Sequence, residues 1–243
     1  MRNDNKYNPS NAPDTLNGHI FYGLNIDEHQ KYFRDLIWSR ENICVACNSK
    51  SGSGKSTIAV ATANLLYEYG LYDSISYICF PCMEEKMGYL PGNKEEKLEP
   101  YMQPLKDALM AININPEYVI ANQEDMEAMK RGDHYINFMS HVHLRGTNFS
   151  NQIVIVDEAQ NSYFDELKKV LTRFHDNCKI ILIGHTEQCD LFKHPEKSGF
   201  AIYLKAFEQY EKENPDDMRI KTCKLYKNYR GFFSAFADDV KFN

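Results

Sequence analysis

Short apolar runs alternate along the chain with amphipathic stretches whose apolar residues recur at helical spacing. The runs predict strands and the amphipathic stretches predict helices. The predicted strands are 43–47, 75–80, 117–121, 152–156 and 179–183, and the predicted helices are 56–69, 94–111, 163–174 and 198–212. Strands that alternate with helices form a parallel sheet covered by helices. The pattern therefore predicts an α/β fold.

The first 18 residues differ from the rest of the chain. They are rich in Asn, Asp and Pro without periodicity, so residues 1–18 are predicted to form a loose polar arm. Residues 19–243 are predicted to form a single domain, because 243 residues with 43% apolar content suffice for one large core. The N-terminus lacks the apolar core of a signal peptide, and no run of about 18 apolar residues could cross a bilayer. We expect a cytoplasmic protein without membrane contact.

The charge and the cysteine content limit which ligands, nucleic acid and zinc among them, the chain is expected to bind. The net charge of −6 gives no global positive field that would attract nucleic acid, so any such site must be a local patch.

Two Cys-x-x-Cys pairs, at 44/47 and 79/82, resemble the spacing of zinc-binding cysteines. Cys44 and Cys47 lie in a predicted strand, where residues three apart face opposite sides, so both cannot bind one metal ion. We interpret these cysteines as small buried side chains in a reducing compartment.

A loop of small residues joins the first predicted strand to the first predicted helix, with the sequence Asn-Ser-Lys-Ser-Gly-Ser-Gly-Lys-Ser-Thr at 48–57. Backbone N–H groups of such a loop wrap phosphates, and the helix N-terminus adds its positive dipole end. Lys55 is expected to reach the β- and γ-phosphates and Ser56 to bind Mg²⁺. A flexible linker is the alternative, but a linker would not open a long helix after a buried strand. The predicted nucleotide-binding residues are Ser51, Gly52, Ser53, Gly54, Lys55, Ser56 and Thr57.

Polar residues follow two later strands. Asp157 and Glu158 end an apolar run; Asp157 is expected to bind Mg²⁺, and Glu158 to orient and deprotonate an attacking water. The adjacent pair therefore favours hydrolysis over binding alone. Gln188 follows the strand at 179–183 at the edge where ligands bind, so we expect it to contact the γ-phosphate or the water. His185, in the same loop, is interpreted as a solvated residue without chemistry.

These motifs, in this order, resemble the PhoH-like (phosphate-starvation-inducible) ATPase family, which is similar to superfamily-one helicase cores. The resemblance covers most of 20–240 and implies a P-loop NTPase with a mainly parallel sheet sandwiched by helices, as in RecA-like cores. It also implies ATP and Mg²⁺ as cofactors. Its most distinctive segments are the phosphate loop, 81–92, 99–105, 144–147, 157–161, 171–173 and 184–191. Two residues depart from the family pattern: Ser49 replaces the first loop glycine, and His185 replaces an aspartate.

The resemblance implies further roles by position. Gln30 matches a family glutamine whose amide is expected to pair with adenine N6 and N7; the alternative is a plain surface glutamine on a helix. Arg173 and Arg230, ranked ahead of Arg145, are candidates to stabilise transition-state charge, one of them across a subunit boundary. Surface salt bridges are the alternative for any single arginine. A homo-oligomer, as a hexameric ring, is also implied.

The similarity to helicases favours a motor acting on RNA or single-stranded DNA. A groove for a single strand needs basic residues with exposed aromatics, although alternating Tyr and Lys are equally typical of a half-buried edge strand. The alternatives are a nucleotide-dependent switch or assembly ATPase with a protein partner, and a small-molecule kinase. Glu158 argues against the kinase, because a water-activating base beside ATP would waste it. The candidate groups are Lys130, Arg131, His134 and Tyr135, and Lys224, Tyr226, Lys227, Tyr229 and Arg230.

Overall fold

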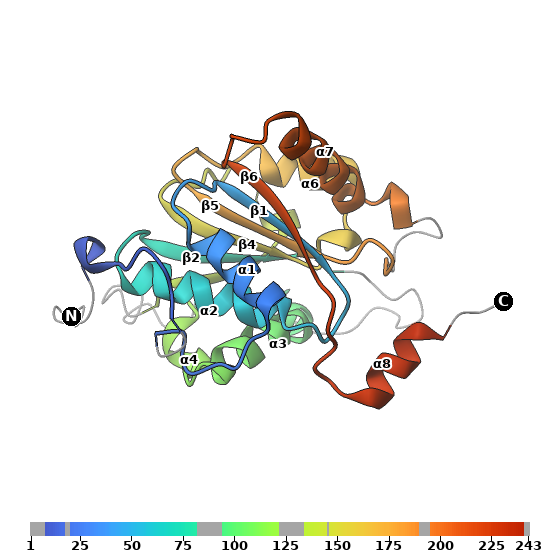
Figure 1. The fold of residues 1–243 in the computed structure, drawn as a ribbon, viewed down its shortest axis with the longest axis horizontal. Coiled ribbons are helices and arrows are strands. Elements are labelled where there is room, and N and C mark those ends of the chain that lie inside the picture. The colour runs from blue at the N-terminus through green and yellow to red at the C-terminus, as the bar shows by residue number, and fades with distance from the viewer. Residues whose placement is uncertain are drawn as a thin grey trace.

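The computed structural model describes residues 8–17, 20–81, 94–121, 134–144, 146–189 and 195–240. Six parallel strands form one sheet in the order β3-β2-β4-β5-β1-β6 (Figure 1). The strands are β1 (Cys44–Ser49), β2 (Ser74–Cys79), β3 (Ile136–Ser140), β4 (Gln152–Asp157), β5 (Lys179–Gly184) and β6 (Ile220–Leu225). The helices are α1 (Glu28–Trp38), α2 (Lys55–Glu68), α3 (Lys94–Ala111), α4 (Pro116–Val119), α6 (Phe164–Leu171), α7 (Gly199–Glu213) and α8 (Phe232–Asp239). Short 3₁₀ turns are η1 (Pro9–Asn11), η2 (His141–His143), η3 (Ala159–Asn161) and η4 (Pro195–Lys197).

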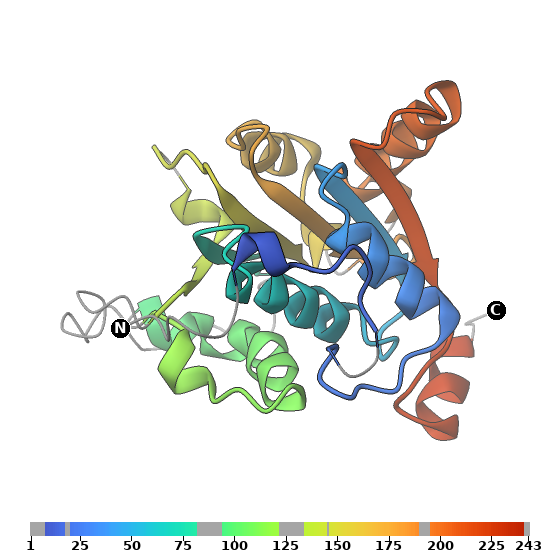
Figure 2. The ribbon, with the colours of Figure 1, turned by 60° about the vertical axis from the view of Figure 1, so that its left-hand side comes forward.

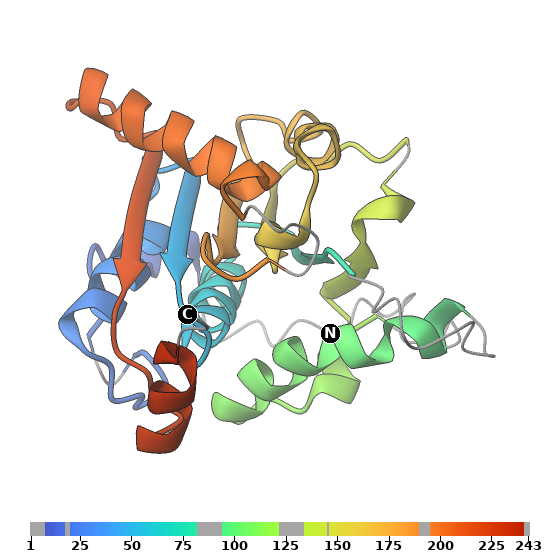
Figure 3. The same cartoon turned by 90° about the vertical axis from the view of Figure 1, so that its right-hand side faces the viewer.

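Helices cover both faces of the sheet (Figures 2 and 3). One apolar cluster joins the sheet to α1, α2 and α3, and a second joins it to α6 and α7. Neighbouring strand residues alternate between the two clusters, so Val45 and Cys47 pack in the first and Ala46 in the second. Both faces are therefore apolar, as in parallel sheets generally. The predicted α/β sandwich is confirmed.

Most predicted elements are present, but one is wrong. Residues 117–121 do not form a strand; Pro116–Val119 form a helical turn instead. The side chain of Asn115 caps this turn by accepting a hydrogen bond from the N–H of Glu117 at 3.0 Å, and proline occupies its first position. Both residues favour a helix start. The short apolar run that follows fits a buried helix as well as a strand. Hydrophobicity alone therefore did not distinguish the two at this position.

Four further elements were not predicted from the sequence: α1, β3, β6 and α8. The start of α1 carries a local signal, because Asp27 and Gln30 form a capping box that precedes a buried face. β6 carries a weaker one, since its buried residues alternate with more exposed ones at the edge of the sheet. α3 follows the prediction over 94–111 even though Pro100 and Pro104 lie inside it.

Part of the predicted arm packs against the domain. Leu16 is only 4% exposed, and the carbonyl oxygen of Pro13 accepts a hydrogen bond of 2.9 Å from the indole of Trp38. The predominantly polar composition of the arm therefore gave no sign of this buried apolar contact. The division of the chain into an arm and a single domain stays a prediction. Among the described helices, none is long and apolar enough to cross a membrane.

Three cysteines of the imitated zinc pattern are core side chains. Cys44 and Cys47 are buried free thiols in β1, and Cys79 is a buried free thiol in β2. Burial, and the nearby carboxylate of Asp157, raise the pKa of Cys79 to about 12. The Cys79 thiol therefore stays protonated. All three side chains are small and buried, as expected. Cys82 lies outside the described residues.

Candidate nucleotide site

The candidate site lies at the carboxyl edge of the sheet, where β1, β5 and β4 end side by side. β5 pairs with both β1 and β4, and Asn48 of β1 stands opposite Gly184 of β5. The segments that follow these strands, 50–54, 185–189 and 158–163, therefore meet at one edge. Ligands of open parallel sheets bind at this edge.

Two glycines give the loop after β1 its shape. Gly52 has a φ of 76° and Gly54 a φ of 82°, a left-handed conformation that other residues rarely adopt. A Cβ atom at Gly52 would lie 2.7 Å from Oδ1 of Asn228, and one at Gly54 would lie 2.8 Å from Nε2 of Gln30. The loop is thus a closely held backbone cradle. This geometry suits the predicted phosphate-binding role of residues 51–57, which stays a prediction.

Ser49 and Gln30 hold the loop from two sides. The hydroxyls of Ser49 and Ser53 are hydrogen-bonded and buried, so the serine that replaces the family glycine ties the loop to the end of β1. Ser49 belongs to a strand and needs no glycine conformation. Gln30 donates from Nε2 to the carbonyl oxygen of Ser53 at 2.8 Å, and its Oε1 accepts from the N–H of Asp27 at 3.1 Å.

The structure contradicts one of the two interpretations of Gln30. It is only 5% exposed, so it is not a surface glutamine. The contacts to Ser53 and Asp27 use one N–H and one lone pair of the amide, which has two of each, so pairing with adenine N6 and N7 stays a prediction. The hydrogen bond to Ser53 also makes Gln30 a residue that positions the loop.

The start of α2 meets the end of β4. The hydroxyl of Ser56 donates a hydrogen bond of 2.9 Å to Oδ2 of Asp157, which also accepts from the hydroxyl of Tyr77. Asp157 is 2% exposed and Lys55 is 8% exposed. Burial and the Asp157 carboxylate raise the pKa of Tyr77 well above its usual value, so Tyr77 remains a hydrogen-bond donor. Sequence reasoning missed Tyr77, whose contact depends on the pairing of β2 with β4.

Glu158 is held by a residue that the sequence did not single out. Its backbone is left-handed with a φ of 53°, and Nε2 of Gln160 donates to Oε2 of Glu158 at 2.5 Å. Oε1 of Gln160 accepts from the N–H of His185 at 3.1 Å. Gln160 therefore fixes the Glu158 carboxylate relative to β5. His185 is 7% exposed, so its interpretation as a solvated loop residue is wrong.

Asn48 joins the phosphate loop to the segment that carries Gln188. It donates from Nδ2 to the hydroxyl of Thr186 at 2.9 Å and accepts from the N–H of Thr186 at 3.1 Å. Gln188 follows two residues later and is exposed at the same edge. The structure thus brings Gln188 to the predicted side of the sheet, and its contact with a phosphate or water stays a prediction.

The segment after β6 brings Arg230 to the loop. The N–H of Tyr229 donates to the carbonyl oxygen of Gly52 at 2.8 Å, and the Tyr229 hydroxyl donates to Asp27 at 2.8 Å. Cγ and Cδ of Arg230 lie 3.0 and 3.1 Å from where a Cβ of Gly52 would stand. The N–H of Arg230 donates to Oδ1 of Asn228 at 2.8 Å. Arg230 is therefore beside the phosphate loop of its own chain.

Arg173 lies at the other edge of the sheet. It follows α6, its carbonyl oxygen accepts from the N–H of Phe149, and its Nη1 donates to the carbonyl oxygen of Thr147 at 3.2 Å. A six-residue strand is about 20 Å long, which separates Arg173 from the phosphate loop of its own chain. The structure therefore does not bring Arg173 into the site. Arg145 lies outside the described residues.

The residues at the carboxyl edge fit the groups that the resemblance implies. A hydroxyl and a carboxylate, Ser56 and Asp157, are hard oxygen ligands of the kind Mg²⁺ prefers. The glycine cradle and the buried Lys55 suit phosphates. Within the described part of the chain, no ion pair of Lys55 is found. These residues therefore fit a nucleotide with Mg²⁺, and the binding of both stays a prediction.

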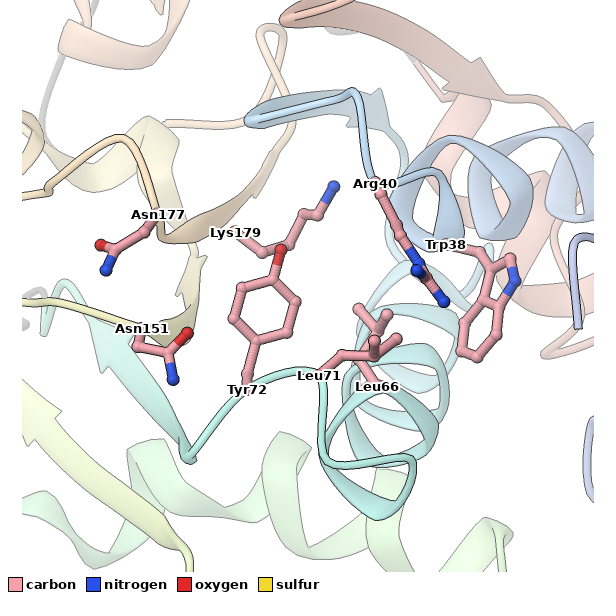
Figure 4. A pocket seen from close by; sticks show the side chains of 8 residues that line it. All are labelled: Trp38, Arg40, Leu66, Leu71, Tyr72, Asn151, Asn177 and Lys179. Carbon is pink, nitrogen blue, oxygen red and sulfur yellow. The ribbon is translucent and has the colours of Figure 1, made fainter. Parts of the chain in front are cut away.

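A separate pocket of about 180 Å³ lies at the amino edge of the sheet, away from the phosphate loop (Figure 4). It is lined by Trp38, Arg40, Tyr72 and Lys179, among others. Lys179 is fully buried, and its ammonium donates to the carbonyl oxygens of Ser39, at 2.6 Å, and Asn42. Burial lowers the pKa of Lys179 to about 7.

Lys179 should make stability depend on pH. Between pH 7 and about 10 the unfolded lysine holds a proton that the folded one has lost, so the free energy of unfolding rises with pH. At about 1.4 kcal/mol per pH unit, we expect a gain of ~2 kcal/mol from pH 7 to 9 that Lys179→Met lacks. Urea unfolding at both pH values measures it, with Lys205→Met on exposed α7 surface as the control. An equal pH dependence in Lys179→Met and the unchanged protein would contradict this prediction.

Comparison with known proteins places the chain in a family. Residues 25–224 match the family model described as PhoH-like protein. Protein PhoH2 of Bacillus subtilis (strain 168) is 36% identical over 177 residues, covering 70% of this chain and 38% of that protein. Protein PhoH of Escherichia coli (strain K12) is 28% identical over 187 residues, covering 76% of this chain and 50% of that protein. The chain thus spans half or less of the length of these relatives.

A solved structure with partial similarity is the large terminase of bacteriophage HK97. It aligns with a TM-score of 0.47 and 10% identity, over 84% of this chain and 40% of that chain. Both values are low, so no functional conclusion is taken from this similarity. The family model, in contrast, matches most of the chain, including the phosphate loop, Asp157 and Glu158. The chain therefore belongs to the PhoH-like protein family and has the α/β fold of a P-loop NTPase.

Proposed function

We propose that this protein binds ATP with Mg²⁺ and hydrolyses it. The observation that carries the proposal is the hydrogen bond of 2.9 Å between Ser56, at the start of α2, and Asp157, at the end of β4. This contact joins the glycine cradle to a carboxylate pair, and P-loop NTPases use that combination to hold phosphates and a metal ion. Lys55 and the loop N–H groups are proposed to bind the phosphates.

The proposed chemistry assigns a role to each group at the carboxyl edge. Glu158 accepts a proton from a water whose oxygen forms a bond to the γ-phosphorus, while the bond to the β–γ bridging oxygen breaks, giving ADP and phosphate. Gln160 orients Glu158, and Arg230 stabilises charge on the transferred group. Bound Mg²⁺ supplies charge neutralisation at the β- and γ-phosphates. Ser56 and Asp157 would hold it.

We further propose that hydrolysis is coupled to RNA or single-stranded DNA. The side chains of Lys224, Tyr226, Lys227, Tyr229 and Arg230 are exposed on the edge strand β6 and the segment after it. Because all five side chains are exposed, they argue against the alternative that the alternating Tyr and Lys residues belong to a half-buried edge strand. Basic and aromatic side chains of this kind bind the backbone and bases of a single strand. The segment also contacts Gly52, so a polymer bound there would lie beside the phosphate loop.

The candidate group at 130–135 receives less support as a binding surface for a single strand. Lys130 and Arg131 lie outside the described residues, while Tyr135 is only partly exposed and stacks on Tyr67 at 3.9 Å. The runner-up function is a switch or assembly ATPase with a protein partner. It is favoured by the net charge of −6, which repels nucleic acid outside a local patch.

The motor proposal predicts polymer-stimulated hydrolysis. We expect single-stranded RNA or DNA to raise the steady-state ATPase rate several-fold, and Lys224→Glu with Lys227→Glu to remove the stimulation, because reversed charges repel the phosphate backbone. The basal rate should persist. The matched control is Lys205→Glu with Lys212→Glu, two exposed lysines of α7. Hydrolysis that is indifferent to both polymers would favour the protein-partner function instead.

A further inference from the structure

Lys179, the first residue of β5, is buried without an acidic partner in the described part of the chain. Its side chain is 0% exposed, and its ammonium donates to two acceptors there, the carbonyl oxygens of Ser39 and Asn42. An ammonium has three N–H groups, so one remains beyond these two contacts. Lysines are almost never fully buried unless a negative charge accompanies them. The surroundings of Lys179 therefore indicate a missing counter-charge.

Two titratable side chains near Lys179 are neutral and do not supply this counter-charge. Burial raises the pKa of the Cys44 thiol, on the neighbouring strand β1, to about 12, and burial also raises the pKa of Tyr72, which precedes β2. The exposed carboxylate of Asp73 accepts a hydrogen bond of 2.7 Å from Asn151, and Asp73 is not part of the pocket wall. Burial of Lys179 is thus not offset, which is why its pKa falls to about 7.

A second cation, Arg40, lines the same pocket from the segment between α1 and β1. Figure 4 shows the side chains of Arg40 and Lys179 on the walls of one hollow, above Leu66 and Leu71. Nη2 of Arg40 donates to the carbonyl oxygen of Pro9 over a long 3.4 Å. Of the residues that the structure describes, none forms an ion pair with either cation. Arg40 is exposed, so its guanidinium is accessible to a ligand.

Most of the other walls of this pocket are apolar. Trp38 and Leu66 are buried, and Leu71 and Tyr72 are half-buried. The pocket has a volume of about 180 Å³, and an apolar cavity of about 150 Å³ holds a benzene molecule. Small-molecule sites combine such walls with a few charged groups that fix the orientation of the ligand. The pocket therefore suits a compact apolar body that carries a negative charge.

We propose that this pocket binds a small carboxylate with a compact apolar body. The planar guanidinium of Arg40 can donate two parallel hydrogen bonds to a carboxylate, whereas a phosphate would leave oxygens against apolar walls. Lys179 acts through its charge from behind the wall, because its side chain has no exposed surface. The bound anion supplies the missing counter-charge. The site lies at the amino edge of the sheet, so the proposal does not depend on ATP hydrolysis.

Trp38 gives a direct measurement, because it is the single tryptophan of the chain and lines the pocket. Its fluorescence is titrated with benzoate, and with benzamide, which has nearly the same shape but no charge. We expect saturable binding of benzoate and about 10-fold or more weaker binding of benzamide. The affinity for benzoate should fall about 10-fold or more from pH 7 to pH 9, as Lys179 loses its proton. Nucleotide is omitted, so the result is independent of the proposed function.

Two variants remove one cation each. Arg40→Gln changes an exposed residue, so the fold should tolerate it, and we expect benzoate to bind about 10-fold or more weakly. Lys179→Met should weaken binding at pH 7 and abolish the dependence of the affinity on pH. The matched control is Lys205→Met on the exposed surface of α7, which should bind benzoate like the unchanged protein.

Several results would overturn the proposal: no response to benzoate, equal binding of benzoate and benzamide, an affinity that does not change with pH, or normal binding by Arg40→Gln. Inorganic phosphate is the last probe. Phosphate that binds as tightly as benzoate would indicate a general anion site and contradict the role of the apolar walls. Circular dichroism checks that each variant is folded, and Arg40→Gln decides the outcome if Lys179→Met does not fold.

Discussion

Replacing Glu158 by glutamine is expected to lower the rate of ATP turnover by about 10²–10⁴-fold, the usual contribution of a general base. Glutamine keeps the size and hydrogen-bonding capacity of the side chain but cannot accept the proton of the attacking water. The contact with Nε2 of Gln160 can persist through the remaining carbonyl oxygen. ATP should therefore still bind with similar affinity.

Steady-state phosphate release and calorimetric ATP binding measure the two effects separately. The matched control is Glu187→Gln, an exposed glutamate in the loop after β5 that removes the same charge near the same edge. That variant should hydrolyse ATP normally. If Glu158→Gln hydrolyses ATP at the rate of the unchanged protein, the assignment of Glu158 as the base is wrong.

The second large effect is expected at Lys55. Its ammonium is buried beside the glycine cradle, so Lys55→Met should remove a charge-assisted bond to phosphate worth about 1.5–3 kcal/mol. That free energy corresponds to a loss of ATP affinity of about 10–150-fold. The fold should tolerate the change, because methionine fills similar space and no longer buries a charge.

Calorimetric titration with ATP and Mg²⁺ gives the affinity, and thermal unfolding checks the fold. Lys50→Met is the matched control, since Lys50 belongs to the same loop ahead of its glycines. It should change ATP affinity much less than Lys55→Met does. Equal losses in both variants would mean that general positive charge, rather than the position of Lys55, determines binding.

The sequence predicted the parts of the site that depend on local pattern. A small-residue loop between a strand and a helix, and two carboxylates at a strand end, located Lys55, Ser56, Asp157 and Glu158. Their meeting followed from parallel strands ending at one edge. The fold class was also predictable from local pattern. The alternation of apolar runs with amphipathic stretches can be recognised even when the predicted bounds of each element are wrong by a few residues.

The residues that were missed depend on contacts distant in sequence. Tyr77 reaches Asp157 because β2 pairs with β4, and Asn48 reaches Thr186 because β1 pairs with β5. Contacts distant in sequence also decide why Arg230 lies beside the phosphate loop of its own chain and Arg173 does not. Their positions depend on which edge of the sheet each turn occupies and on β6 lying next to β1, and no local periodicity encodes strand order.

The first turn of α1 has a consequence for how the protein is made. Asp27 there binds the hydroxyl of Tyr229, Gln30 binds the carbonyl of Ser53, and Tyr229 in turn binds Gly52. A ribosome releases the glycine loop long before it releases Tyr229. During synthesis the loop therefore exists for a time without its contact to Tyr229. A nascent chain would acquire its complete nucleotide pocket late, after the sheet edge it rests on has already formed.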